Sequence, residues 1–118
     1  MVLRHKRHGR DKRKENNMTK TYARKINDLG EPKFELGTVV STPGAISVAS
    51  RSELIESLNR HARGDWGEIC DHDRKENEFS LQNGFRLFSV YRTESGIRYW
   101  IITEADRSVT TILLPHEY

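Results

Sequence analysis

Alternation of apolar and polar residues is clearest in the last third of the chain. Three runs there, Phe85–Thr93, Ile97–Glu104 and Ser108–Leu114, are rich in β-branched and aromatic residues and predict strands. The turns between them, 94–96 and 105–107, are short. Such connections join neighbouring antiparallel strands, so the pattern predicts a three-stranded meander. Because the runs carry apolar side chains on both faces, we expect one face to pack on helices and the other to be partly covered.

Apolar residues at helical spacing precede the meander. Pro43 follows Thr42, a residue type suited to an N-cap, and predicts a short helix over about residues 43–49. Ser50 and Glu53 then form the Ser-x-x-Glu pattern of a capping box. The helix that this box opens carries one apolar stripe and ends before a glycine suited to a helix stop: Leu54, Ile55, Leu58 and Ala62, then Gly64.

Two further elements complete the predicted domain. Residues 71–82 are polar, with acidic side chains early and Asn83-Gly84 at the end, which indicates an exposed helix. Phe34–Ser41 contains β-branched residues and predicts a short strand. The expected fold class is α+β, with two or three N-terminal helices packed on an antiparallel sheet of three or four strands that ends in the meander.

The content of large apolar residues and the net charge both change near residue 33. Residues 34–118 hold both tryptophans and all four phenylalanines, enough for one modest core. Residues 1–33 carry 11 Lys/Arg and 4 Asp/Glu, a net of +7, whereas 34–118 carry 9 and 13, a net of −4. We therefore expect a disordered basic arm over 1–33 and a single α+β domain over 34–118. Within the arm, Met18 is a candidate start, which would make 1–17 an upstream extension.

Composition disfavours several classes of protein. Cys70 is the one cysteine of the sequence, so neither an intrachain disulfide nor a cysteine-based zinc site can form. No apolar run approaches the roughly 18 residues of a membrane span, and Met1–Lys6 lacks the apolar core of a secretory signal. We expect a cytoplasmic protein that uses no cofactor and does not contact a membrane.

Several blocks of sequence carry a family resemblance. They are Phe34-Glu-Leu-Gly, Thr42-Pro-Gly-Ala, His61-Ala-Arg-Gly-Asp-Trp-Gly67, Glu76-Asn77 and the final run from Ile102 to Tyr118. Through them, the stretch from Phe34 to Tyr118 resembles a family of small bacterial proteins found on plasmids and other mobile elements. The resemblance implies an association with mobile DNA, and it does not extend to the arm.

Members of that family sometimes carry the label of a type I restriction methylase subunit. An adenine methylase needs a glycine-rich turn for S-adenosylmethionine and an Asn-Pro-Pro-aromatic loop for the flipped base. This sequence contains no Asn-Pro dipeptide and no Gly-x-Gly. The residues therefore do not support the label.

The first candidate site lies at the end of the second predicted helix. His61, Asp65, Trp66 and Glu68 fall within eight residues and can form an acid–base group beside an aromatic platform, with His61 titrating near neutral pH. A structural interpretation is favoured: the acid caps a turn and the tryptophan anchors the loop in the core.

A second cluster of ligand-type side chains lies in the third predicted helix. Its members are Asp71, His72, Asp73, Glu76 and Glu78. Neighbours at i and i+2 point apart on a helix, and neither an EF-hand loop nor a His-x-x-x-His pattern is present. We therefore predict a solvated helix and no metal site.

The last turn and the C-terminus supply the remaining candidates. Arg107 is able to clamp a carboxylate or phosphate, and Thr110 lies close to it in the sequence. The structural alternative is a hairpin turn with an ion pair. His116 can share a cleft with His61 if the fold brings them together.

The basic arm is the part of the chain suited to nucleic acid. Residues 4–14 hold most of its Lys and Arg side chains, each of which can contact a phosphate. Interleaved aromatic residues, which stack on bases, are missing from it. A solvated tail is the favoured interpretation.

Two functional hypotheses remain. The first, favoured because no catalytic motif is present, is a non-enzymatic accessory or interaction protein of mobile DNA that binds an unidentified protein partner. The second is a small ribonuclease-like, toxin-like enzyme in which His61 or Glu68, His116 and Arg107 supply the base, the acid and the phosphate-binding cation. The net charge of −4 on residues 34–118 disfavours an RNA substrate.

Overall fold

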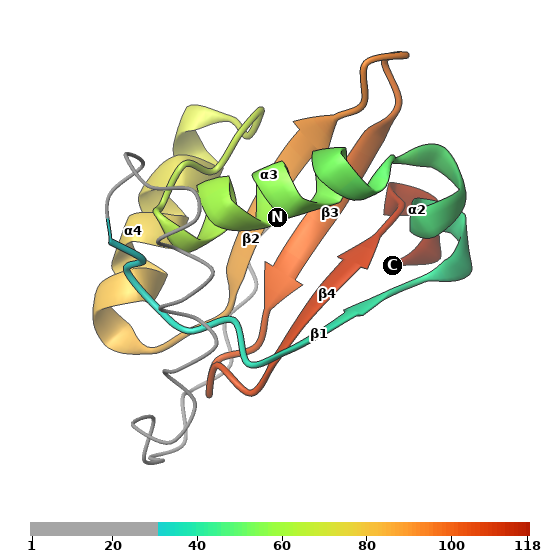
Figure 1. The fold of residues 1–118 in the computed structure, drawn as a ribbon. Helices are drawn as coiled ribbons and strands as arrows, with labels where there is room; N and C mark the ends of the chain where they lie inside the picture. Colours follow the sequence, from blue (N-terminus) through green and yellow to red (C-terminus); the bar gives the residue numbers. More distant parts are fainter. Residues whose placement is uncertain (1–30) are drawn as a thin grey trace.

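The computed structural model describes residues 31–118 (Figure 1). Most of the expected arm, 1–33, and the candidate start at Met18 fall on residues 1–30, outside the described part. The elements are β1 (Thr38–Ser41), α2 (Pro43–Val48), α3 (Arg51–Ala62), α4 (Asp71–Asn83), β2 (Leu87–Arg92), β3 (Arg98–Thr103), β4 (Val109–Leu113) and a terminal 3₁₀ turn, η3 (Pro115–Glu117). Among these elements no helix is long and apolar enough to cross a membrane.

The sheet has four strands in the order β1-β4-β3-β2. The predicted meander is confirmed, because β2 pairs with β3 and β3 with β4, both antiparallel. The prediction of an antiparallel sheet throughout is wrong: β1 pairs in parallel with β4, from Thr38 opposite Val109 to Ser41 opposite Ile112. A parallel pair needs a long crossover, and here the crossover contains all three described helices and the first two strands of the meander.

Local capping fixes where the helices begin and end. The Thr42 side chain accepts a hydrogen bond from the Ala45 amide at 3.2 Å, so α2 starts at Pro43 as predicted. The capping box of α3 is confirmed: the Glu53 amide donates to Ser50 Oγ at 3.1 Å, and the Ser50 amide donates to Glu53 Oε1 at 2.8 Å. α4 ends at Gly84, whose φ of 78° suits a left-handed cap.

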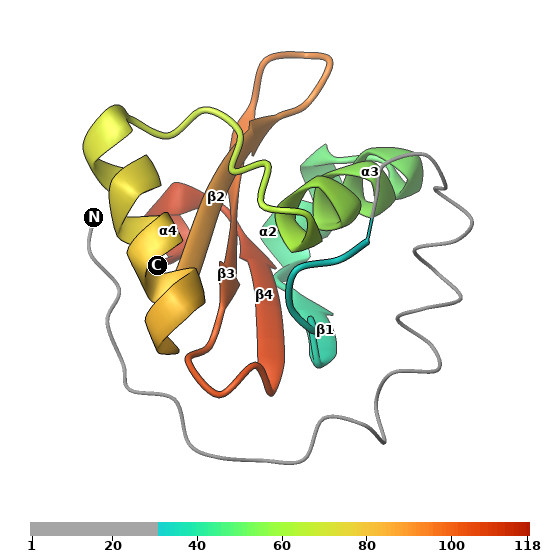
Figure 2. The ribbon, with the colours of Figure 1, turned by 90° about the vertical axis from the view of Figure 1, so that its left-hand side faces the viewer.

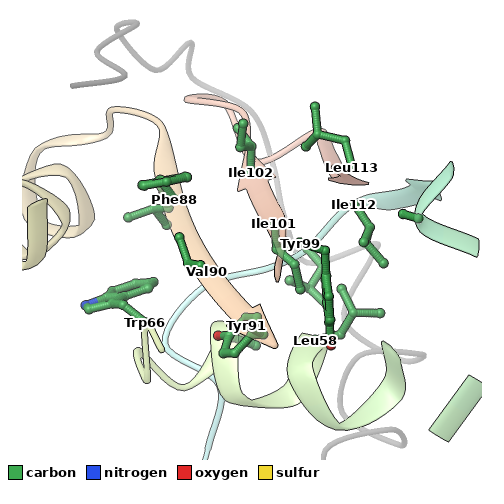
Figure 3. Close-up of a cluster of buried hydrophobic side chains, with 14 of the residues drawn as sticks. Leu58, Trp66, Phe88, Val90, Tyr91, Tyr99, Ile101, Ile102, Ile112 and Leu113 are labelled. Atoms are coloured by element: carbon green, nitrogen blue, oxygen red, sulfur yellow. The ribbon is translucent and has the colours of Figure 1, made fainter. Parts of the chain in front are cut away.

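Helices cover both faces of the sheet. Figure 2 shows the sheet between α3 on one side and α4 on the other. In Figure 3, Tyr91, Tyr99 and Ile112 lie on the face toward α3, and Leu58 of α3 packs there. Phe88 and Ile102 lie on the opposite face. The domain is therefore α+β with a mixed four-stranded sheet at its centre, and both faces of that sheet bury apolar side chains.

Candidate functional site

His61 lies in the interior, at the start of a chain of buried hydroxyls. Its side chain is 0% exposed, and its ring nitrogens contact two neighbouring strands. Nδ1 hydrogen-bonds Ser89 Oγ, and Nε2 hydrogen-bonds Thr103 Oγ1 at 2.8 Å. Thr103 Oγ1 bonds Thr110 Oγ1 at 2.7 Å, and the Thr110 hydroxyl donates to the Leu36 carbonyl at 2.7 Å. The chain therefore links α3 to three strands and to the segment that enters β1.

The directions of these hydrogen bonds show which atom of the network carries each hydroxyl or imidazole proton. Because Thr110 uses its one hydroxyl proton on a carbonyl, it accepts from Thr103. Since Thr103 donates its one hydroxyl proton to Thr110, it must accept from the Nε2–H of His61. Nδ1 is left as an acceptor for the Ser89 hydroxyl. The network is complete with a neutral imidazole protonated at Nε2.

Burial, and then the charge of Arg107, lowers the pKa of His61 to about 3. The expectation that His61 titrates near neutral pH is therefore wrong. Phe34 and Trp66 enclose the ring edge-on, with centroids 5.2 and 5.7 Å away, so solvent does not reach it. The imidazole is unable to exchange a proton with a substrate on the surface.

The rest of the first candidate cluster divides between core and surface. Trp66 is 1% exposed and donates from Nε1 to Glu78 of α4 at 2.8 Å, so it anchors the loop in the core. Asp65 is on the surface, where it pairs with Arg60 at 2.8 Å. That hydrogen bond is the main reason that the pKa of Asp65 is lowered. Glu68 is also on the surface and pairs with Arg92 at 2.9 Å.

Arg107 is also buried, and its guanidinium binds backbone carbonyls of the domain instead of facing a ligand. Its guanidinium donates to the carbonyls of Phe85 at 2.6 Å, Glu104 at 3.1 Å and Ser80 at 3.2 Å. Its φ of 62° lies in the left-handed region, which closes the turn between β3 and β4. Asp106 supports this turn by accepting from the Ser108 amide at 2.9 Å. Arg107 therefore ties the end of α4 to the meander and does not face solvent.

The fold does not bring the ribonuclease candidates together. His61 and Arg107 are in the interior, with Thr110 beside them in the hydroxyl network, while Glu68 and His116 are exposed or nearly so. Within residues 31–118, no three His, Cys, Asp or Glu side chains gather closely enough to hold a metal ion. Cys70 is exposed and caps the start of α4.

A concave surface of the described domain lies between α3 and the β2–β3 hairpin, away from these candidates. It is a groove of about 610 Å³ with a mostly polar lining. One wall is the exposed side of α3, and the other is the end of β2 with the hairpin turn. The residues that line it are Val48, Ser50, Ser52, Glu53, Glu56, Ser57, Arg60, Tyr91, Arg92, Thr93, Glu94, Ser95 and Tyr99.

The groove is acidic. Its charged lining consists of three glutamates, including Glu56 and Glu94, and two arginines. Arg60 is already paired with Asp65 and stacks over the Tyr91 ring at 4.8 Å, and Arg92 is paired with Glu68. Glu68 also pairs with Arg98 at 3.5 Å. The three lining glutamates and the two paired carboxylates, set against these three arginines, give a net charge of −2. A cationic ligand is favoured over an anionic one.

Two tyrosines form the base of the groove, paired across the hairpin. The Tyr99 hydroxyl donates to Ser57 Oγ at 2.9 Å, and the Tyr91 hydroxyl donates to the Asp65 carbonyl. Burial raises the pKa of both phenols, so both stay neutral at physiological pH. Glu53 is fixed in place, because Oε1 accepts from Ser50 and Oε2 accepts from the Glu94 amide at 2.7 Å. Because both tyrosines are only 2% exposed and Glu53 is bonded at both oxygens, the groove has a firmly held base.

Comparisons of this chain with protein-family models, with curated proteins and with solved structures found no match. The resemblance to proteins of mobile elements therefore stays a prediction.

Sequence reasoning missed the groove. Its acidic wall comes from α3 and the hairpin turn, which are about 40 residues apart in the sequence. One signal was present: Glu53 and Glu56 lie on the α3 face opposite the apolar stripe, next to serines. Nothing in the periodicity shows that the hairpin turn lies against that face.

Proposed function

We propose that this chain is a non-enzymatic interaction protein, and that the groove between α3 and the β2–β3 hairpin binds a protein partner through a basic, polar segment. The observation that carries the proposal is the charge of the groove. Its carboxylates face a concave surface whose two arginines already have carboxylate partners. The proposed association with mobile DNA rests on the family resemblance alone.

An extended peptide with Lys or Arg side chains fits this chemistry. Glu56 and Glu94 stand on opposite walls and can each form a charge-assisted hydrogen bond with a basic side chain. Ser52 and Ser95 offer hydroxyls to the peptide backbone. Because Glu53, Tyr91 and Tyr99 are held by hydrogen bonds within the domain, little ordering of the groove is needed on binding.

The ribonuclease hypothesis has less support. It requires a base, an acid and a cation that all reach one phosphate. His61 and Arg107 are at most 1% exposed, and the groove that a substrate would enter is acidic. Both features weigh against RNA chemistry at these residues.

The proposal is tested by peptide binding to the full chain. The probe is a fluorescein-labelled peptide of alternating Lys and Ser residues, followed by fluorescence anisotropy in low salt. We expect saturable binding that weakens by about tenfold or more in the Glu56→Gln, Glu94→Gln double variant, since each lost ionic hydrogen bond is worth about 1 kcal/mol. Glu53 is left intact because it caps α3.

The matched control is Asp71→Asn, which removes the same kind of charge from the start of α4, outside the groove. It should bind the peptide like the wild-type chain. Equal weakening in the control and the double variant would contradict a groove-specific site, as would no binding by the wild-type chain. RNA cleavage by the purified chain that is lost in Glu68→Gln or His116→Ala would favour the ribonuclease hypothesis instead.

A further inference from the structure

The two edges of the sheet differ in whether the outward backbone groups of the edge strand are hydrogen-bonded within the domain. At the β2 edge, the Asn77 side chain of α4 bonds both backbone groups of Phe88: its amide nitrogen donates to the carbonyl, and its oxygen accepts from the Phe88 N–H at 3.1 Å. The loop after α3 bonds the next outward residue, Val90, whose N–H donates to Trp66 at 3.1 Å and whose carbonyl accepts from Glu68 at 2.7 Å. Side chain and loop therefore seal this edge of the sheet.

At the opposite edge, β1 has only β4 beside it within the described chain. Thr38 and Thr42 donate backbone hydrogen bonds to Ser108 and Ile112 of the β4 side, both at 2.9 Å. Backbone groups of a strand alternate in direction, so those of Val39 and Ser41 point away from the sheet. The edge therefore offers two N–H donors and two carbonyl acceptors to another strand.

The side chains of β1 do not block this edge. Thr38, Val39 and Val40 are exposed, the two valines at 41% and 43%, and they alternate between the two faces of the sheet. Charged residues and proline, which commonly protect an edge strand, are not found in β1.

Charge identifies the kind of partner. Residues 36–50 contain no charged side chain, although 31% of the whole chain is charged. Two identical charged edges repel each other, whereas two identical neutral edges do not. A long neutral stretch around an open edge is what pairing with a second copy of the same chain requires.

We infer that β1 pairs antiparallel with β1 of a second copy, which joins the two sheets into one. In such a symmetric pair the twofold axis is perpendicular to the sheet and passes beside one residue of each copy. An axis at Val40 places Val39 of each copy opposite Ser41 of the other, so that all four outward groups of each strand are bonded. An axis at Val39 would instead use Gly37, whose φ of 67° is not that of a strand.

This register places the two Val40 side chains in direct contact. Val40 then forms a non-hydrogen-bonded pair with its counterpart, the closest kind of cross-strand pair, with Cα atoms about 4.5 Å apart. Thr38 lies opposite Thr42 of the other copy, so the two Thr38 residues are offset by four positions, or about 13 Å. Because four residues a side bury little area, we expect a weak dimer with a dissociation constant of about 10–100 μM.

Disulfide trapping in the full chain tests the pairing and its register. Cys70 is first replaced by serine, since it is exposed and would form disulfides of its own. In that background, Val40→Cys should form a disulfide-linked dimer under mild oxidation at 100 μM protein, at least about fivefold more than the matched control Thr38→Cys. Equal yields from the two variants, or no dimer from either, would overturn the inference.

Sedimentation of the chain without engineered cysteines provides the second measurement. The wild-type chain should show a concentration-dependent dimer, and Val40→Lys should be monomeric because two ammonium groups would face each other. Gln82→Lys adds the same charge on the exposed surface of α4 and should dimerise like the wild type. A wild-type chain that stays monomeric at 200 μM would refute self-pairing, whatever the result of the peptide-binding experiment, because β1 is not part of the groove.

Discussion

At the scale of single residues, the imidazole of His61 shows how a reactive side chain becomes part of a core. Each ring nitrogen has a hydroxyl partner, and the hydroxyl chain ends on a backbone carbonyl. Such a network stabilises the fold when every member is bonded, and loses much of its value when one is removed.

The stability of the domain should therefore fall as the pH drops below about 6.5. The unfolded chain then protonates His61, whereas the native chain keeps it neutral down to a pKa of about 3. Each pH unit in this window should lower the free energy of unfolding by about 1.4 kcal/mol. Urea unfolding at pH 7, 6 and 5 measures the slope, mostly above the range in which carboxylates titrate. A stability that is the same at pH 7 and pH 5 would contradict the assignment, and His61→Gln should abolish the slope.

Thr110→Val should destabilise the domain by about 2 kcal/mol. The substitution keeps the shape of the side chain but removes the bonds to Thr103 and to the Leu36 carbonyl, which is then left buried without its donor. Thr111→Val is the matched control on the opposite face of β4 and should change stability by less than about 0.5 kcal/mol. Chemical unfolding at pH 7 compares the three chains, and similar losses in both variants would count against the network.

The burial of His61 could have been predicted from the sequence. Leu54, Leu58, His61 and Ala62 recur at helical spacing, so the imidazole is on the apolar stripe of α3. The position of Arg107 could not, since its guanidinium binds carbonyls from Ser80, Phe85 and Glu104, which only the folded chain brings together. A polar residue in a turn gives no sign of whether it faces inward.

At the scale of elements, Gly67 permits the loop after α3 to seal the β2 edge. Its φ is 74°, and a Cβ atom there would fall on the Val90 carbonyl oxygen. We expect Gly67→Ala to cost more than about 3 kcal/mol, because the loop must leave the edge. Gly96→Ala is the control: its φ is also positive, at 94°, but nothing lies within 4 Å of the new atom. Gly96→Ala should lower the free energy of unfolding by about 1 kcal/mol. Equal melting temperatures for the two variants would show that the contact between the loop and the β2 edge is unimportant.

The elements themselves were largely predictable, but their pairing was not. Thr42-Pro43, the capping box and Gly84 marked helix ends by local chemistry, and short turns made the meander predictable. The β-branched residues of the run containing β1 also predict a strand. Its parallel pairing with β4 was missed because periodicity identifies a strand and gives no information about a distant partner.

At the scale of the whole molecule, the two proposed surfaces differ in charge and should respond differently to salt. The groove is acidic, whereas β1 lies in a neutral stretch. Raising NaCl from 50 to 500 mM should weaken binding of the Lys-Ser peptide by about tenfold and leave the dimer dissociation constant within about twofold. Anisotropy and sedimentation in the same buffers make the comparison. A dimer that dissociates in salt would point to charged contacts beyond β1.

The parallel pair of β1 and β4 also bears on how the domain is made. Val39 meets Thr110 across 71 positions of the chain, so the ribosome must synthesise β4 before β1 can pair with it. Pairing of such distant segments slows folding, because closing a large loop costs entropy before any contact stabilises the pair. A nascent chain that stops before residue 109 would leave both β1 and β3 without the strand that lies between them. Completion of the sheet therefore waits until β4 has left the ribosome.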